Sequence, residues 1–191
     1  PVKMKSIPHV ISWNLTKACN LLCTHCYLLA DNVQLGNQPD TNLPDTAAVQ
    51  EAPNFNQVQC GSANAADELD TEKALKVIDE IAELNPNLIL ILTGGEPLLR
   101  EDLFDLSRHA AGKGMMVLLG TNACLIDDEM AKSLKDNGFS GIGISLDSVH
   151  PEIHDSIRGA KGSWEKAVEG MKACKRQGLE IQIQSTVFKK L

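Results

Sequence analysis

The chain has 191 residues, 43% of them hydrophobic, and a formal net charge of −7. This length can fill one compact core, whereas the acidic balance, the lack of a Lys/Arg stripe and an aromatic content of 4% argue against nucleic-acid binding. The longest apolar runs, 88–92 and 115–119, are far too short to span a bilayer, and the first ten residues lack the apolar stretch of a signal peptide.

The predicted elements alternate between strand and helix along most of the chain. Helical periodicity predicts four helices and short apolar or alternating runs predict five strands. In chain order they are a strand at 9–15, a helix at 71–84, a strand at 87–92, a helix at 101–112, a strand at 115–120, a helix at 127–138, a strand at 141–146, a helix at 163–178 and a strand at 180–188. Such alternation is typical of parallel strands joined by right-handed crossovers. A closed eight-unit barrel needs about 250 residues, so we expect an open or partial α/β barrel.

Residue types at the helix ends support these boundaries. Asp70 or Thr71 is expected to cap the first helix, and Ser163 is expected to cap the last one. Gly138 is the expected residue just beyond the third helix, where a left-handed backbone is common. We take 1–191 as a single domain.

One segment, residues 31–69, breaks the alternation. It is rich in Asn, Gln, Pro, Asp and Ala and has no period. A loop of this length is either functional or mobile. A solvent-exposed insertion is the favoured interpretation, and a substrate lid or a partner-docking loop is the alternative.

Three of the six cysteines are crowded together as C-x3-C-x2-C at Cys19, Cys23 and Cys26. A secreted disulfide framework fits smaller chains without a real core, so a metal site in a cytoplasmic protein is the better interpretation. Structural zinc usually takes two pairs of ligands, and no second pair is present, while His25 adjoins Cys26 and is poorly placed to bind with it. Three thiolates can hold three corners of a four-iron cluster and leave one iron open, as a catalytic site requires. They follow the first strand directly, where barrel folds carry their chemistry.

The motif Cys19-x3-Cys23-x2-Cys26-Tyr27 resembles the signature of radical S-adenosylmethionine (radical SAM) enzymes. Further motifs follow in the order of that family: TGGEP at 93–97, ISLDS at 144–148 and IHDSIRG at 153–159. The resemblance implies a partial (βα)6 TIM-like radical SAM barrel, of which about five strands are present.

The resemblance also implies cofactors and a reaction. A [4Fe-4S] cluster, reduced by a partner such as ferredoxin or flavodoxin, would pass one electron to S-adenosylmethionine and so produce a 5′-deoxyadenosyl radical that abstracts hydrogen from a substrate. The cofactors carry this chemistry, so no side chain is assigned a catalytic role. By this resemblance the cluster is bound by Cys19, Cys23 and Cys26. The methionine amino group of S-adenosylmethionine is bound by Gly94, Gly95 and Glu96, and its carboxylate by Arg158. The ribose is bound by Ser145 and Asp147, and Tyr27 packs near the adenine or contacts the cofactor through its backbone.

Several residues keep a simpler interpretation beside the functional one. Arg158 is alternatively a surface ion pair, and Asn122 in GTNA, where the family often has Thr-Asn-Gly, is alternatively a turn cap. His150 and His154 are expected to face solvent. Gln184 or Ser185 could reach the site. Cys60, Cys124 and Cys174 are expected to behave as buried hydrophobes, although Cys124 could lie near the pocket and Cys60 could be inert, redox-active or a ligand.

Within the family, the motifs look like the SPASM/twitch-type branch, which modifies heme-like tetrapyrroles and matures peptides. Heme or tetrapyrrole cofactor biosynthesis is the first expectation, and a peptide maturase is the alternative. Those relatives carry a C-terminal extension with auxiliary clusters that this chain lacks, so we expect a fragment of a longer protein. Two competing interpretations are a zinc-binding or thiol-redox module without radical chemistry and an inactive scaffold.

Overall fold

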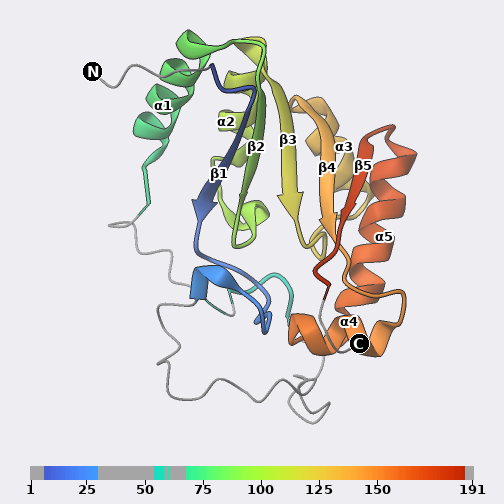
Figure 1. Ribbon diagram of the computed structural model, residues 1–191. Helices are drawn as coiled ribbons and strands as arrows, with labels where there is room; N and C mark the ends of the chain where they lie inside the picture. Colours follow the sequence, from blue (N-terminus) through green and yellow to red (C-terminus); the bar gives the residue numbers. More distant parts are fainter. Residues whose placement is uncertain (1–6, 30–53, 59, 61–67, 188–191) are drawn as a thin grey trace.

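The structure, a computed structural model, describes residues 7–29, 54–58, 60 and 68–187. Its centre is a parallel sheet with the strand order β1-β2-β3-β4-β5 (Figure 1). The strands are β1 (Val10–Thr16), β2 (Ile89–Gly94), β3 (Met116–Thr121), β4 (Phe139–Ser145) and β5 (Glu180–Gln184). This confirms the prediction of an α/β fold with five parallel strands.

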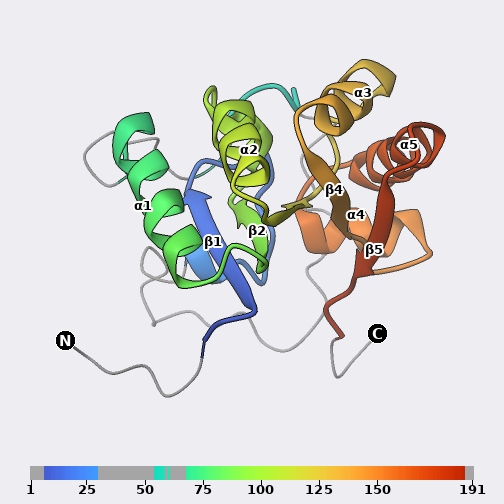
Figure 2. The same ribbon diagram turned by 90° about the horizontal axis from the view of Figure 1, so that it is seen from above.

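Four long helices form one layer on a single face of the sheet (Figure 2). They are α1 (Thr71–Leu84), α2 (Leu103–Gly112), α3 (Asp128–Asp136) and α5 (Ser163–Arg176), and a short helix, α4 (Pro151–Arg158), lies near the carboxyl ends of the strands. Two 3-10 turns, Tyr27–Leu29 and Pro97–Leu99, complete the elements in the described ranges.

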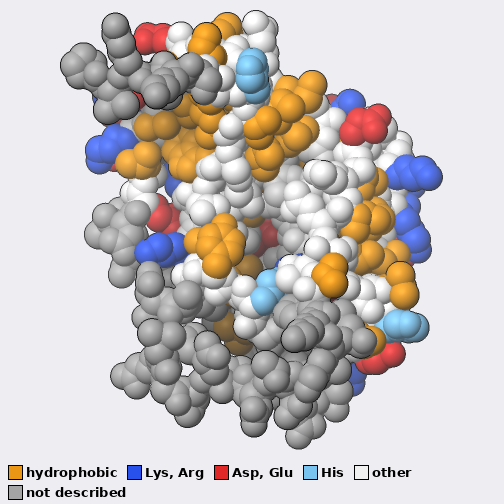
Figure 3. Space-filling view, viewed as in Figure 1, with side chains coloured by type: hydrophobic (Ala, Val, Ile, Leu, Met, Phe, Trp, Pro, Cys, Tyr) orange, Lys and Arg blue, Asp and Glu red, His pale blue; other side chains and the backbone are white. Residues whose placement is uncertain are grey.

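The core lies between the sheet and this helical layer. Alternate strand residues point to opposite faces, and in β2 Leu90 and Leu92 are fully buried against the helices together with Leu119 of β3. Thr93, on the other face of β2, lines a cavity. The space-filling view shows that this uncovered face is hollowed at its centre and apolar above the hollow, over β1 to β3 (Figure 3).

The predicted helix ends are partly confirmed. The Asp70 carboxylate accepts a hydrogen bond from the Lys73 N–H and caps α1. Gly138 has φ 93° just beyond α3, as a left-handed terminating residue should. The prediction for Ser163 is wrong, because Gly162 occupies the cap position and the Ser163 hydroxyl instead donates a hydrogen bond to Asp155.

Helix α4 was not expected from the sequence. Five of its eight residues are buried, and contact with the cysteine loop helps to hold it: the Thr24 N–H donates to the Ile157 carbonyl at 2.9 Å. The expectation for His154 is wrong, because it is only 1% exposed and its ring nitrogen accepts a hydrogen bond from the Asp147 N–H. His150 is exposed, as expected.

Most of the 31–69 insertion lies outside the described residues. The parts that the structure describes are packed on the chain that follows β1. The Asn20 side chain donates to the Phe55 carbonyl at 2.8 Å, and Glu68 accepts from the Thr16 hydroxyl at 2.8 Å. Among the described residues, none of the helices has the length and apolar character needed to cross a bilayer.

We expect Leu119→Ala to lower the free energy of unfolding by about 2–5 kcal/mol, because it leaves a cavity between β3 and the helical layer. Urea titration followed by circular dichroism measures this change. Met116→Ala on the same strand is the control, since Met116 is 51% exposed. Equal losses in both variants would contradict the assignment of the core face.

Candidate active site

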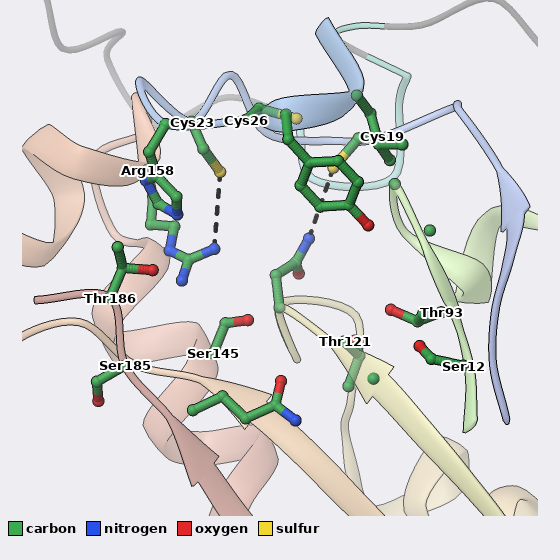
Figure 4. Close-up of a pocket in the computed structure, with 18 residues that line it drawn as sticks. Ser12, Cys19, Cys23, Cys26, Thr93, Thr121, Ser145, Arg158, Ser185 and Thr186 are labelled. Carbon is green, nitrogen blue, oxygen red and sulfur yellow. Dashed lines mark hydrogen bonds between the residues drawn. The ribbon is translucent and has the colours of Figure 1, made fainter. Parts of the chain in front are cut away.

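A cavity of about 390 Å³ opens where the carboxyl ends of the strands meet. The loop after β1 forms one wall of it, and side chains from the strand ends form the floor (Figure 4). Its lining includes Cys19, Cys23, Cys26, Tyr27, Gly94, Gly95, Ser145 and Arg158, all of which the sequence pointed to. The volume is within the range of small-molecule sites.

Backbone contacts between two strand ends hold the cysteine loop in place. The Gly95 N–H donates to the Thr16 carbonyl and the Glu96 N–H donates to the Ala18 carbonyl, both at 2.8 Å. The turn approaches so closely that a Cβ on Gly95 would lie 2.2 Å from the Ala18 oxygen. Gly94, at φ 137°, is equally confined. Glycine is therefore required here for close approach.

The three thiols line the wall that the loop after β1 forms (Figure 4). The Arg158 guanidinium donates to the Cys23 sulfur at 3.7 Å, and the Asn122 side-chain amide reaches the Cys19 sulfur at 4.0 Å. Burial raises the pKa of Cys23 to about 11, and Arg158 acts in the opposite direction. The pKa of Cys19 is also raised, chiefly through a hydrogen bond with Cys60. Deprotonation thus depends on nearby positive charge, which a bound metal supplies strongly.

Glu96 is fully buried and is not among the residues that line the cavity. Both of its oxygens accept from the Thr121 hydroxyl at 2.9 Å, and the N–H groups of Asn122 and Leu98 donate to it at 3.0 and 3.1 Å. Its carboxylate joins the turn after β2 to the end of β3. The contact expected with a methionine amino group stays a prediction.

Asp147 and Arg158 form an ion pair. The distance from Asp147 Oδ2 to Arg158 Nε is 2.7 Å, and the side chains are 0% and 10% exposed. The alternative of a surface ion pair is wrong, because this pair is buried. Asp147 Oδ1 accepts a hydrogen bond from the Thr186 N–H at 3.0 Å, whereas Oδ2 makes the ion pair without a hydrogen bond. The ribose role expected for Asp147 stays a prediction, while Ser145 does line the cavity.

Asn122 is more than the turn cap that the sequence suggested. Its side-chain oxygen accepts from the Cys124 N–H at 2.9 Å, which confirms the turn, and its amide donates to Asn20 at 2.7 Å while it lines the cavity. Ala123 has φ 61°, the left-handed backbone that suits the glycine often found there in the family. Ala123, in place of that glycine, therefore leaves the turn intact.

The remaining expectations have mixed outcomes. Tyr27 is 69% exposed and its hydroxyl donates to Asn14 at 3.1 Å beside the cavity. Gln184 and Ser185 both line the cavity. Cys174 is fully buried in the main core, and Cys124 is buried beside Cys19.

Sequence reasoning gave no role to six further cavity-lining residues, Ser12, Leu28, Thr93, Gly120, Thr121 and Thr186. Ser12 and Thr93 lie on neighbouring parallel strands, on the face away from the helices. Polar residues at alternate positions of otherwise apolar strands were the available indication.

The family model of the radical SAM superfamily matches residues 13–191. The chain belongs to the radical SAM superfamily. Members of this superfamily use a [4Fe-4S] cluster and S-adenosylmethionine (AdoMet).

Curated relatives of this radical SAM chain include two proteins of Methanosarcina barkeri (strain Fusaro / DSM 804). The Fe-coproporphyrin III synthase is 35% identical over 94% of the chain and 37% of its own length, and the AdoMet-dependent heme synthase is 32% identical over 99% and 45%. The mycofactocin maturase MftC of Mycolicibacterium smegmatis is 28% identical over 90% and 35%. The chain thus spans less than half the length of these relatives.

Solved structures agree on the fold. Native anSMEcpe with bound AdoMet matches with a TM-score of 0.61 and 21% identity, over 92% of this chain and 43% of its own. SuiB of Streptococcus suis bound to S-adenosylmethionine matches with a TM-score of 0.64 and 15% identity, over 94% and 34%. The partial radical SAM barrel is therefore confirmed as the fold class.

The donor set fits an iron–sulfur cluster. Cys19, Cys23 and Cys26 line one cavity, yet within the described ranges no three His, Cys, Asp or Glu side chains converge as single-ion ligands. One zinc at about 2.3 Å from each sulfur would need the three sulfurs closer together. Three sulfurs that line one cavity wall without converging on a single point suit a larger, multi-iron group.

We expect Gly95→Ala to displace the cysteine loop, because the added Cβ would overlap the Ala18 carbonyl. The measurement is iron and sulfide content after anaerobic reconstitution, which should fall strongly. Gly112→Ala is the matched control, since among the described residues no atom outside its chain neighbours and its own helix backbone lies within 4 Å of that Cβ. Unchanged cluster content in Gly95→Ala would mean that this contact does not position the loop.

Glu96 should make stability depend on pH. Burial raises its pKa from 4.5 to about 7. Between these values the folded state binds more protons than the unfolded state, so this contribution to stability is full at low pH and declines as the pH rises from 4.5 to about 7. The difference in free energy of unfolding between the wild type and Glu96→Gln should follow that decline in urea titrations. A difference that stays constant across this window would contradict the raised pKa.

Proposed function

We propose that this chain is the core of a radical SAM enzyme that reductively cleaves S-adenosylmethionine. The observation that carries the proposal is the placement of Cys19, Cys23 and Cys26 around one cavity at the carboxyl ends of parallel strands. Barrel enzymes carry their chemistry at this end of the sheet. Three ligands leave one iron of a four-iron cluster free to bind a cofactor.

The cluster and S-adenosylmethionine, when bound, supply the electron and the carbon–sulfur bond whose cleavage starts radical chemistry. The chain's own residues hold and shield them. The backbone groups of Gly94 and Gly95 lie at the cavity wall, where they can meet a methionine amino group without side-chain interference. Glu96 holds that turn in position through its contacts with the end of β3. We assign it this positioning role or, after a local shift of its side chain, direct contact with the methionine amino group.

Arg158 is the cationic group of the cavity that we assign to the methionine carboxylate. Its Nε is paired with Asp147, and its Nη1 donates to the Cys23 sulfur. A guanidinium has five N–H donors, so others remain for a carboxylate. Asp147 then fixes the orientation of Arg158, while Ser145 is the residue placed to contact a ribose hydroxyl. Tyr27, at the cavity edge, is proposed to border the adenine.

The proposed substrate is a tetrapyrrole of heme biosynthesis. The support is the named relatives: the coproporphyrin and heme synthases of Methanosarcina barkeri are 35% and 32% identical, above the 28% of the mycofactocin maturase. A peptide substrate is the second candidate, supported by that maturase and by the SuiB structure bound to a precursor peptide. A low-potential protein such as ferredoxin or flavodoxin is the proposed electron donor, in the cytoplasm.

The test is anaerobic. The chain is reconstituted with iron and sulfide, reduced with dithionite, mixed with S-adenosylmethionine and assayed for 5′-deoxyadenosine. We expect product from the wild type and none from Cys23→Ala, because the cluster would then lack one of its three cysteine ligands. Cys174→Ala is the matched control, since Cys174 lies in the core away from the cavity.

Each other result has a definite meaning. A chain that binds zinc and no iron, with no product, would favour the zinc or thiol-redox module. A four-iron cluster without product would contradict cleavage by this chain. Equal product from Cys23→Ala would remove Cys23 from the ligand set.

A further inference from the structure

Cys60, which lies in the 31–69 insertion, faces the first cysteine of the cluster motif. The Cys19 N–H donates to the Cys60 carbonyl at 2.9 Å, and the Cys60 N–H donates to the Cys19 carbonyl at 3.1 Å, which makes an isolated antiparallel bridge. Two residues that exchange both hydrogen bonds have Cα atoms about 5.5 Å apart. This is within the range that disulfides span, about 4.4–6.8 Å.

The side chains of this pair also meet. The Cys60 thiol interacts with that of Cys19 and raises the pKa of Cys19, and Cys60 Sγ donates to the Leu21 carbonyl at 3.0 Å. Cys19 is buried, whereas Cys60 is half-buried and so is the more accessible member. A thiol–disulfide exchange would therefore begin at Cys60 and be completed by Cys19, which lies directly opposite.

The neighbouring cysteine, Cys124, is different. It is buried in the same small cluster with Cys19 and Leu21, but its sulfur contacts the Asn122 and Ser163 carbonyls, both at 3.8 Å. Burial beside Cys19 is therefore not sufficient for a cysteine to pair with it. Cys60 is distinguished by the backbone bridge that places it opposite Cys19.

We propose that Cys19 and Cys60 form a reversible disulfide in the cluster-free chain, which withholds a cluster ligand until it is reduced. The proposal rests on the proposed function of Cys19 as an iron ligand. With glutathione disulfide as the oxidant, Cys60 attacks one glutathione sulfur and releases one glutathione. Cys19 then attacks the Cys60 sulfur and releases the second, so that two thiols are oxidised and one glutathione disulfide is reduced to two thiols.

The functional consequence concerns cluster assembly. A sulfur held in a disulfide cannot bind iron as a thiolate. The linked form leaves Cys23 and Cys26 as the free thiols of the motif, too few to hold three corners of a cluster. The disulfide also protects Cys19 from irreversible oxidation while no iron is bound.

The experiment uses the purified chain without its cluster, treated with glutathione disulfide, alkylated and digested with chymotrypsin. This protease cleaves after Tyr27 and Phe55 and so separates Cys60 from the cluster motif, whereas trypsin has no site between Lys17 and Lys73. We expect mass spectrometry to find a Cys19–Cys60 cross-link. Iron and sulfide uptake by the oxidised chain should be largely lost, and dithiothreitol should restore it.

Cys60→Ser and Cys124→Ser are the matched variants. Cys60→Ser should take up iron and sulfide equally before and after glutathione disulfide, while Cys124→Ser should behave as the wild type. The proposal is overturned by a cross-link from Cys19 to Cys23, Cys26 or Cys124, by Cys60 carrying only glutathione, or by full cluster uptake in the oxidised wild type. If the reduced wild type takes up no cluster, the proposed function fails instead, and the peptide map still decides the disulfide.

Discussion

The close backbone contact between the turn after β2 and the chain after β1 is the constraint on which the site depends. Gly95 and Glu96 donate to the Thr16 and Ala18 carbonyls, and no side chain fits at Gly95. The contact fixes where the cysteine loop leaves the sheet. Because Cys19 follows Ala18 directly, a displacement of this contact would move the first thiol and with it the wall of the cavity.

Buried polar groups around that contact form hydrogen-bonded and charged pairs, which link the strand ends to the cysteine loop. Glu96 joins the β2 turn to Thr121 and Asn122, and Asn122 reaches the Cys19 sulfur. Asp147 orients Arg158, which donates to the Cys23 sulfur. Charges and amides are costly to bury without partners, so these networks hold the cavity in one arrangement. Arg158 also brings positive charge to the Cys23 thiol, which lowers the pKa of that thiol against the effect of burial.

The insertion is connected to the same wall. Its described parts contact the cysteine loop through Phe55, Cys60 and Glu68. On the face of the sheet away from the described helices, the surface is hollowed at its centre and apolar above the hollow (Figure 3).

The sequence by itself determined the order of strands and helices along the chain and the cysteine motif, because period-2 and period-3.6 patterns and a C-x3-C-x2-C spacing are local properties. It also indicated that Gly94, Ser145 and Arg158 would gather at one edge, since parallel strands share their carboxyl ends. Only the tertiary structure decided that Glu96 and Asp147 bond to protein groups beside the cavity, that α4 forms, and that Cys60 faces Cys19. Those features depend on contacts between residues distant in the chain, such as the 41 positions that separate Cys19 from Cys60, and no local pattern encodes them.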